Sequence, residues 1–210
     1  MTLQGKPPYR CLITKGELNS LNFHSESAKL VERLREAVDD GVNLIQVREK
    51  NLPARLLSDL VTSALQAVLH SAATIVVNDR VDVALTAGSA GVHLAQHSMP
   101  AEIVRSTFGP GLTIGVSTHS LAEAASAYAA GADYIVFGPV FATPGKGPAV
   151  GVESLAAVCR AVAPMPVIAL GGIDVNNFHL LQAAEIAGVA AIRSLHDRKS
   201  RMVICDGIIR

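Results

Sequence analysis

The feature that most constrains the fold of this chain is an alternation of short apolar runs with helix-like segments, repeated eight times. Each apolar run holds four to six residues, and the spacing between runs is nearly even. Runs of this kind, separated by segments of helical periodicity, are typical of strands that alternate with helices in a parallel sheet. The predicted strands cover residues 9–14, 42–47, 74–77, 91–94, 113–116, 134–137, 167–170 and 189–192.

Eight such repeats in 210 residues predict a closed (β/α)8 TIM barrel that forms one domain over residues 1–210. The alternative, an open doubly wound sheet, is marked by G-x-G-x-x-G after its first strand, and that motif does not follow residues 9–14. The tail, residues 196–210, has poor helical periodicity, so it forms either a short irregular helix or another kind of packing. We expect a polar loop at residues 15–27 and helices at residues 28–40, 56–69, 101–108, 152–162 and 175–187.

Composition and charge argue against several classes of function. The formal net charge is zero, so no basic footprint indicates binding to nucleic acid or to an anionic membrane. The first ten residues lack the apolar region of a signal peptide, and no apolar run is long enough to span a bilayer. Three widely spaced cysteines, an odd number, predict neither a disulfide framework nor a zinc site and are typical of a reducing cytoplasm.

Polar residues that directly follow the predicted strands are the candidates for a site, because a (β/α)8 barrel carries its active site at the carboxyl ends of its strands. Gln46, Arg48 and Lys50 follow the second strand at alternate positions, which directs them to one side of an extended segment. Two cations and an amide suit a polyanion such as diphosphate. The alternative is a solvated, charged loop.

The third and fifth strands are also followed by polar residues. Asn78 and Asp79 follow the third strand, where a carboxylate can hold Mg²⁺ together with substrate phosphates. The alternative is a helix N-cap. After the fifth strand, we interpret Ser117 as a binding residue and His119 as a capping or packed residue. His93, in the fourth strand, is interpreted as a satisfied core or rim histidine.

The last three strands are followed by residues that suit a phosphate group. Thr143 and Lys146 lie on a glycine-containing loop after the sixth strand and can contact phosphate oxygens. Gly172, after the seventh strand, allows the backbone to approach a ligand closely. Ile192 and Arg193 follow the eighth strand, and the loops after strands seven and eight form the common phosphate site of this fold.

The chain resembles the family of thiamine phosphate synthases and thiazole tautomerases over about residues 10–195. This resemblance implies a TIM barrel, a homodimer and small phosphorylated pyrimidine and thiazole substrates. The segments that carry it are IQVREK (45–50), VNDRVDVAL (77–85), GVHLAQ (91–96), IGVSTHS (114–120), GADYIVFGPVFATPGK (131–146) and VIALGGID (167–174).

The resemblance implies that the chain joins a hydroxymethylpyrimidine diphosphate to a thiazole phosphate, with release of diphosphate. Arg48, Lys50 and Lys146 would be catalytic and, with Gln46 and Asn78, would bind the pyrimidine diphosphate. Asp79 would hold Mg²⁺, and Ser117 would contact the diphosphate or the pyrimidine. The thiazole phosphate would be surrounded by Thr143, Gly172, Ile192 and Arg193.

Four positions depart from the family patterns. Ser98 stands where synthases have an aspartate as second magnesium ligand, and Gly145 replaces a hydroxyl residue in the loop after the sixth strand. Arg193 stands where a serine is common, and Pro139 replaces the catalytic histidine of the tautomerases. The leading hypothesis is a thiamine phosphate synthase. Because of these departures, the alternatives are a tautomerase-like isomerase and a non-catalytic binder of thiazole phosphate or thiamine phosphate.

Overall fold

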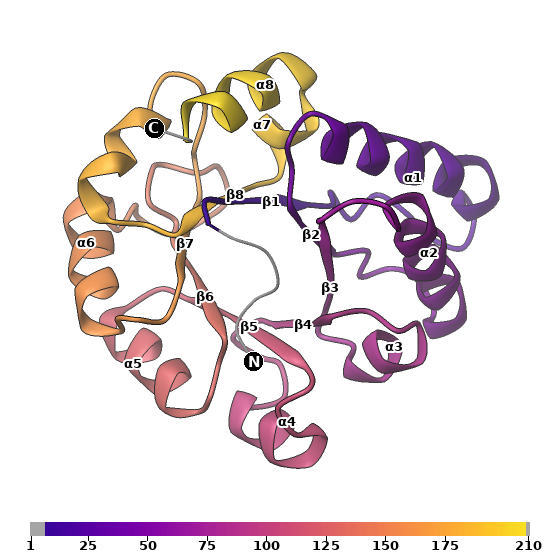
Figure 1. Cartoon of the computed structure of the whole chain (residues 1–210), viewed down its shortest axis with the longest axis horizontal. Helices are drawn as coiled ribbons and strands as arrows, with labels where there is room; N and C mark the ends of the chain where they lie inside the picture. Colours follow the sequence, from indigo (N-terminus) through magenta and orange to yellow (C-terminus); the bar gives the residue numbers. More distant parts are fainter. Residues whose placement is uncertain (1–6, 209–210) are drawn as a thin grey trace.

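The protein, described here for residues 7–208 in a computed structural model, contains a closed barrel of eight parallel strands in sequence order (Figure 1). The first strand pairs with the last, which closes the barrel. The predicted (β/α)8 fold is therefore confirmed. The strands are β1 (Tyr9–Ile13), β2 (Leu44–Val47), β3 (Thr74–Asn78), β4 (Gly91–Leu94), β5 (Thr113–Thr118), β6 (Tyr134–Phe137), β7 (Val167–Leu170) and β8 (Gly188–Ala191).

Helices surround the ring of strands, and each lies on its outer side (Figure 1). They are α1 (Phe23–Asp39), α2 (Ala54–Ala67), α3 (Val81–Thr86), α4 (Ala101–Phe108), α5 (Leu121–Ala129), α6 (Gly151–Ala161), the 3-10 helix η1 (Phe178–Ala184), α7 (Arg193–His196) and α8 (Arg198–Gly207). Among residues 7–208, none of the helices combines the length and the apolar character that a membrane span requires.

Strand side chains alternate between two separate parts of the core. One set fills the inside of the barrel and includes Cys11, Leu44, Val76 and Tyr134. The other set, which includes Ile45, packs against the surrounding helices. Because both faces of the sheet are buried, most strand residues are apolar, and this is why the strands could be predicted well.

Two predicted helices differ from those observed. Helix α1 begins at Phe23, so the predicted polar loop through residue 27 is wrong at its end. Phe23 is buried and anchors a first turn whose other residues are polar. The helix predicted at residues 175–187 is the shorter η1, because Asp174 and Asn177 bond to nearby backbone N–H groups and form a turn first.

The tail forms a regular helix, α8, from residue 198 to residue 207. Its inward face carries Arg201, whose guanidinium donates to the Asp40 carboxylate at 2.6 Å and to the Leu195 carbonyl at 3.0 Å. A buried arginine replaces an apolar residue on this face, so the helical periodicity is weak. Helix α8 is thereby fixed to the end of α1, its neighbour in Figure 1.

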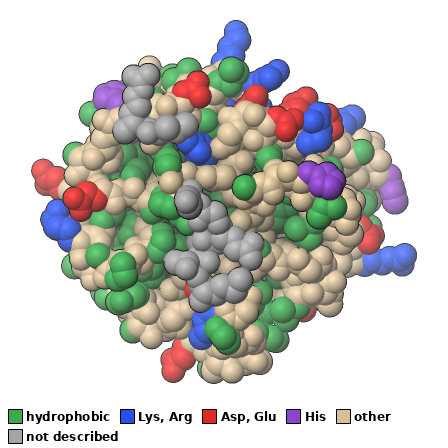
Figure 2. Space-filling model, viewed as in Figure 1, with side chains coloured by type: hydrophobic (Ala, Val, Ile, Leu, Met, Phe, Trp, Pro, Cys, Tyr) green, Lys and Arg blue, Asp and Glu red, His purple; other side chains and the backbone are tan. Residues whose placement is uncertain are grey.

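Charged side chains of both signs lie interspersed around the edge of the face shown in Figure 2. This arrangement agrees with the net charge of zero and gives that face no patch of a single sign. Any charge-based recognition on this protein must therefore be local.

We predict that Arg201→Leu lowers the free energy of unfolding by about 3 kcal/mol at neutral pH, because it leaves Asp40 buried with a weaker partner. The matched variant Arg198→Leu, which removes an exposed partner of the same carboxylate, should cost under about 1 kcal/mol. Denaturant unfolding measures both changes, and equal losses would contradict the prediction.

The same pair should make stability depend on pH. Hydrogen bonds from Arg201 and Arg198 lower the pKa of Asp40, so its stabilisation is present above the ordinary aspartate pKa of about 3.9. This contribution is lost as the pH falls through the lowered pKa. The difference in stability between the wild type and Arg201→Leu should therefore shrink in acid.

Candidate functional site

The carboxyl ends of β2 and β3 bring three predicted site residues together. Gln46 Nε2 donates to Asn78 Oδ1 at 2.9 Å, and Asn78 Nδ2 donates to Asp79 Oδ2 at 2.8 Å. Gln46 and Asn78 are both buried, so each amide is held in one orientation by its partners. The chain of hydrogen bonds ends on the carboxylate, which is half-buried at the mouth of the barrel.

Asp79 is held in an uncommon backbone conformation. Its φ of 61° lies in the left-handed region, which costs a non-glycine residue on the order of 1 kcal/mol. The N-cap position of α3 is occupied by Arg80, so the N-cap interpretation of Asp79 is wrong. Among residues 7–208, Asp79 has hydrogen-bond donors around it but no ion-pair partner.

Ser98 lies directly against Asp79. Its hydroxyl donates to Asp79 Oδ1 and accepts a hydrogen bond from the Ala95 N–H at 2.5 Å. Ser98, at the position where the resemblance implies a second magnesium ligand, therefore contacts Asp79, the residue expected to be the first.

The loop after β2 holds Arg48 beside the loop after β1. Strand β2 ends at Val47, so strand alternation orients Gln46 but not Arg48 or Lys50. The Arg48 N–H donates to Thr14 Oγ1 at 2.8 Å. Gly16, at φ +81°, allows the two loops to approach closely, since a Cβ there would lie 3.3 Å from the Arg48 carbonyl oxygen. Arg48 is half-buried, whereas Lys50 is exposed.

Glu49 anchors these two loops and was not identified as a site residue from the sequence. It is only 3% exposed, and its two carboxylate oxygens accept hydrogen bonds from the N–H groups of Gly16 and Leu18, at 3.1 and 2.8 Å. A glutamate between an arginine and a lysine resembles a solvated charge in the sequence, so no local signal marked it. Its contacts keep Gly16 next to Arg48.

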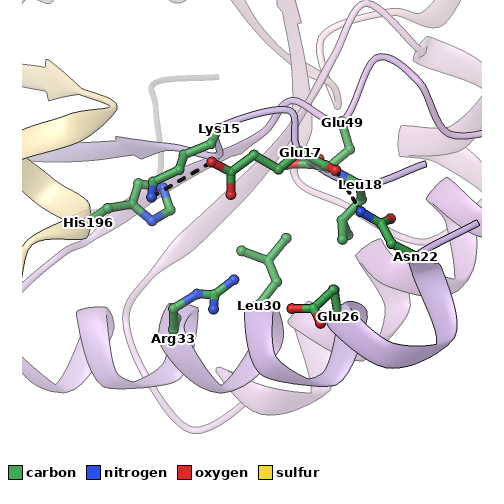
Figure 3. A pocket seen from close by; sticks show the side chains of 9 residues that line it. All are labelled: Lys15, Glu17, Leu18, Asn22, Glu26, Leu30, Arg33, Glu49 and His196. Carbon is green, nitrogen blue, oxygen red and sulfur yellow. Dashed lines mark hydrogen bonds and ion pairs between the residues drawn. The ribbon is translucent and has the colours of Figure 1, made fainter.

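A side cavity of about 270 Å³ lies next to this anchor, between the β1–α1 loop, α1 and α7 (Figure 3). Its charged groups have both signs, and His196 at its edge contacts the carbonyl of Ile13 at 3.1 Å. Burial lowers the pKa of His196. The lining residues are Lys15, Glu17, Leu18, Asn22, Glu26, Leu30, Arg33, Glu49 and His196.

A second cavity, of about 480 Å³, opens at the carboxyl ends of β7 and β8. It brings together all four residues that were expected to surround a thiazole phosphate, namely Thr143, Gly172, Ile192 and Arg193. Arg193 is exposed and forms no ion pair among the described residues. The carboxylates of Asp174 and Asp197 also line the cavity, but neither forms an ion pair with Arg193.

The wall of this cavity depends on a close backbone approach at Gly172. Its φ is +64°, and a Cβ at this position would lie 2.6 Å from the carbonyl oxygen of Ala142. Asn177 Nδ2 donates to the Gly172 carbonyl at 2.7 Å and fixes the turn. Lys146 is exposed on the loop between β6 and α6 and is not among the residues that line the cavity.

Comparison with known proteins decides the family. The family model described as thiamine monophosphate synthase matches residues 11–195. The chain belongs to this family. The predicted family membership is therefore confirmed, and the matched range agrees with the resemblance over about residues 10–195.

Relatives within the synthase family cover most of this chain. The thiamine-phosphate synthase of Moorella thermoacetica is 39% identical over 79% of this chain and 80% of its own length. That of Gloeobacter violaceus is 42% identical over 81% of this chain but only 50% of its own length. Thiamine phosphate pyrophosphorylase from Pyrococcus furiosus superposes with a TM-score of 0.82 at 32% identity, over 96% of this chain and 95% of that one. These relatives support the prediction of an enzyme of thiamine biosynthesis.

His93 has the surroundings expected of a satisfied core histidine, whereas His119, expected to be a capping or packed residue, is exposed and the N-cap of α5 is Ser120. His119 Nδ1 lies 2.5 Å from the Gly138 carbonyl oxygen, and its backbone N–H donates to Glu123. His93 is buried between Tyr134 and Ser117, at 3.2 and 2.8 Å. Burial lowers the pKa of His93 to about 4, so its ring is neutral at pH 7.

We predict that Glu49→Gln lowers the free energy of unfolding by about 1–3 kcal/mol, because the amide group turns a donor toward one of the two backbone N–H groups. The control is Glu17→Gln on the same loop, which is exposed and should change stability by less than about 0.5 kcal/mol. Urea unfolding and amide hydrogen exchange at Leu18 measure the effect. Unchanged protection of Leu18 in Glu49→Gln would contradict the anchoring role.

Proposed function

We propose that this chain is a thiamine phosphate synthase, which joins a hydroxymethylpyrimidine diphosphate to a thiazole phosphate and releases diphosphate. The observation that carries the proposal is the cavity lined by Thr143, Gly172, Ile192 and Arg193, in a chain of the synthase family. The hydrogen-bonded series Gln46–Asn78–Asp79 lies at the same end of the barrel and suits the other substrate, the pyrimidine diphosphate.

The reaction requires charge stabilisation more than proton transfer. The bond between the pyrimidine methylene and the diphosphate oxygen breaks, and its electron pair leaves with the diphosphate. The thiazole nitrogen then donates its lone pair to the methylene carbon. Arg48, Lys50 and Lys146 would stabilise the leaving group by their charge, while Gln46, Asn78 and Ser117 would orient the pyrimidine diphosphate.

Asp79 is the residue that would hold Mg²⁺ in this site. Its carboxylate has only neutral neighbours and no ion-pair partner among residues 7–208, which suits a hard cation. No cluster of three or more His, Cys, Asp or Glu side chains with metal-ligand geometry occurs in that part of the chain. Mg²⁺ commonly uses one or two protein carboxylates together with substrate phosphates, so Asp79 fits this role when diphosphate is bound. The ion would supply additional neutralisation of the leaving diphosphate.

A homodimer in the cytoplasm is a further part of the proposal and rests on the family resemblance. Cys11, Cys159 and Cys205 are free and buried, which supports a reducing compartment. Light scattering of the purified protein tests the dimer, and a mass equal to one chain would contradict it.

The proposed function is tested by incubating the protein with both substrates, with and without Mg²⁺, and measuring thiamine phosphate and diphosphate. We expect both products, and more of them with Mg²⁺. Absence of product under both conditions would contradict the synthase. The thiazole tautomerase reaction should then be assayed directly, and its absence too would favour a non-catalytic binder.

Arg193→Ala should raise the KM for thiazole phosphate roughly tenfold to hundredfold, the effect of losing one charge-assisted hydrogen bond. The matched control is Lys199→Ala, which removes a nearby exposed cation that does not line the cavity. The KM for the pyrimidine diphosphate should change little in either variant. If Arg193→Ala binds thiazole phosphate as tightly as the wild type, the assignment of this cavity is wrong.

Ser98→Asp should tighten Mg²⁺ binding in the presence of diphosphate by roughly tenfold, a typical effect of one group at a metal site. The substitution places a second carboxylate beside Asp79, where Ser98 now donates its hydroxyl. Ser98→Asn is the neutral control of similar size and should not tighten binding. Titration calorimetry measures both, and equal affinities in the two variants would count against Asp79 as the metal ligand.

A further inference from the structure

Inside the barrel, three side chains from neighbouring strands form one hydrogen-bonded row. His93 on β4 contacts the Tyr134 hydroxyl on β6 through Nδ1, at 3.2 Å. Its other ring nitrogen, Nε2, lies 2.8 Å from Ser117 Oγ on β5. Tyr134 and His93 are almost completely buried, whereas Ser117 is half-buried at the mouth of the barrel. The row therefore runs from the core to a predicted substrate-binding residue.

Gly115 makes this row possible. The strand register places His93 opposite Gly115, and Gly115 opposite Tyr134. A Cβ on Gly115 would lie 2.1 Å from Tyr134 Cζ and 2.3 Å from its hydroxyl oxygen. The missing side chain on the middle strand thus lets residues of β4 and β6 meet across β5. Ser117, two residues later, points to the same side because strand side chains alternate.

The number of protons in the row determines the direction of its hydrogen bonds. The Tyr134 hydroxyl has one proton to donate, and the two ring nitrogens of His93 face Tyr134 and Ser117 separately, so a ring that accepts at Nδ1 carries its own proton at Nε2. Among residues 7–208, His93 Nδ1 is the one acceptor within hydrogen-bond distance of the Tyr134 hydroxyl. A buried hydroxyl left without an acceptor would cost about 1–3 kcal/mol, so Tyr134 donates to Nδ1.

This direction assigns the remaining protons. Since Nδ1 accepts from Tyr134, the proton of the neutral ring is on Nε2, which donates to Ser117 Oγ. Ser117 Oγ then accepts the hydrogen bond from His93, so its own hydroxyl proton can be donated to a ligand at the mouth of the barrel. In the opposite tautomer, Ser117 would donate to His93 and would present only lone pairs, which repel an anion.

We propose that Tyr134 and His93 are positioning residues, which direct the hydroxyl proton of Ser117 toward an anionic oxygen of the diphosphate-bearing substrate. The identity of that substrate rests on the proposed function, whereas the tautomer of His93 does not. Neither Tyr134 nor His93 touches the substrate in this arrangement, and each acts through Ser117.

The tautomer is tested by nitrogen NMR of the ligand-free protein labelled with ¹⁵N-histidine. The signals absent from His93→Gln identify His93 among the seven histidines. We expect a protonated Nε2 and an unprotonated Nδ1 in the wild type, and a loss of this preference in Tyr134→Phe. A protonated Nδ1 in the wild type would overturn the proposal, whatever the activity of the protein.

The positioning role is tested by a double-mutant cycle with inorganic diphosphate as the probe, measured by calorimetry in the presence of Mg²⁺. Tyr134→Phe and Ser117→Ala should each weaken binding by roughly fivefold to tenfold, the effect of one hydrogen bond. In the Ser117→Ala background, Tyr134→Phe should have no further effect, because its influence passes through Ser117. Additive losses would overturn the role, since they would mean that Tyr134 acts independently of Ser117.

Thr118→Val is the matched control for these variants. Thr118 neighbours Ser117 on β5, and its buried hydroxyl has no hydrogen-bond partner among the described residues. The substitution should leave diphosphate binding unchanged. If the wild type does not bind diphosphate, the anion partner proposed for Ser117 is wrong, and the NMR result still decides the tautomer. Failure of the synthase assay with intact diphosphate binding would affect the proposed function alone.

Discussion

The pairing of β1 with β8 is the interaction on which the site depends, because it brings the first and last strands to a common rim. In this pair Tyr9 lies opposite Gly188 and Leu12 opposite Ala191. A Cβ on Gly188 would lie 2.1 Å from the Tyr9 carbonyl oxygen, so a larger residue would disturb the closing contact. Closure places the loops after β7 and β8 on the same rim as those after β2 and β3. One mouth can therefore present both the cavity proposed for the thiazole phosphate and the hydrogen-bonded series Gln46–Asn78–Asp79.

Polar groups in the mouth of the barrel are paired through neutral hydrogen bonds, whereas those in the rest of the fold, the scaffold, include ion pairs. The scaffold uses ion pairs, such as Asp40 with Arg201 and Arg105 with Asp133, which join elements distant in sequence. In the mouth, amides, hydroxyls and a neutral imidazole satisfy one another, as in the Gln46–Asn78 contact. Among residues 7–208, the charges of Arg193 and Asp79 are consequently not neutralised by ion pairs within the protein. This separation suits a site whose ligands are anionic, since a cation already paired with a carboxylate would have to break that pair to bind them.

The elements that could be predicted from the sequence are the strands, whose side chains are buried on both faces of the sheet. The predicted strands at residues 91–94, 134–137 and 167–170 match β4, β6 and β7, because strands buried on both faces are largely apolar in sequence. Prediction was weaker for α1 and α8. The first turn of α1 is polar apart from Phe23, and the inward face of α8 carries Arg201. In both cases a single buried contact outweighs the local pattern, and the sequence alone does not reveal which residue will make it.

The candidate site shows the same division between local pattern and long-range contact. The sequence by itself determined the alternation of strands and helices, and thus which polar residues follow each strand, because both depend on short-range periodicity. Only the tertiary structure decided that Glu49 is buried as a loop anchor and that His93 reaches Tyr134 across Gly115. These contacts join residues on different strands and loops. Their strength comes from burial and from the absence of competing water, and no local pattern encodes either one.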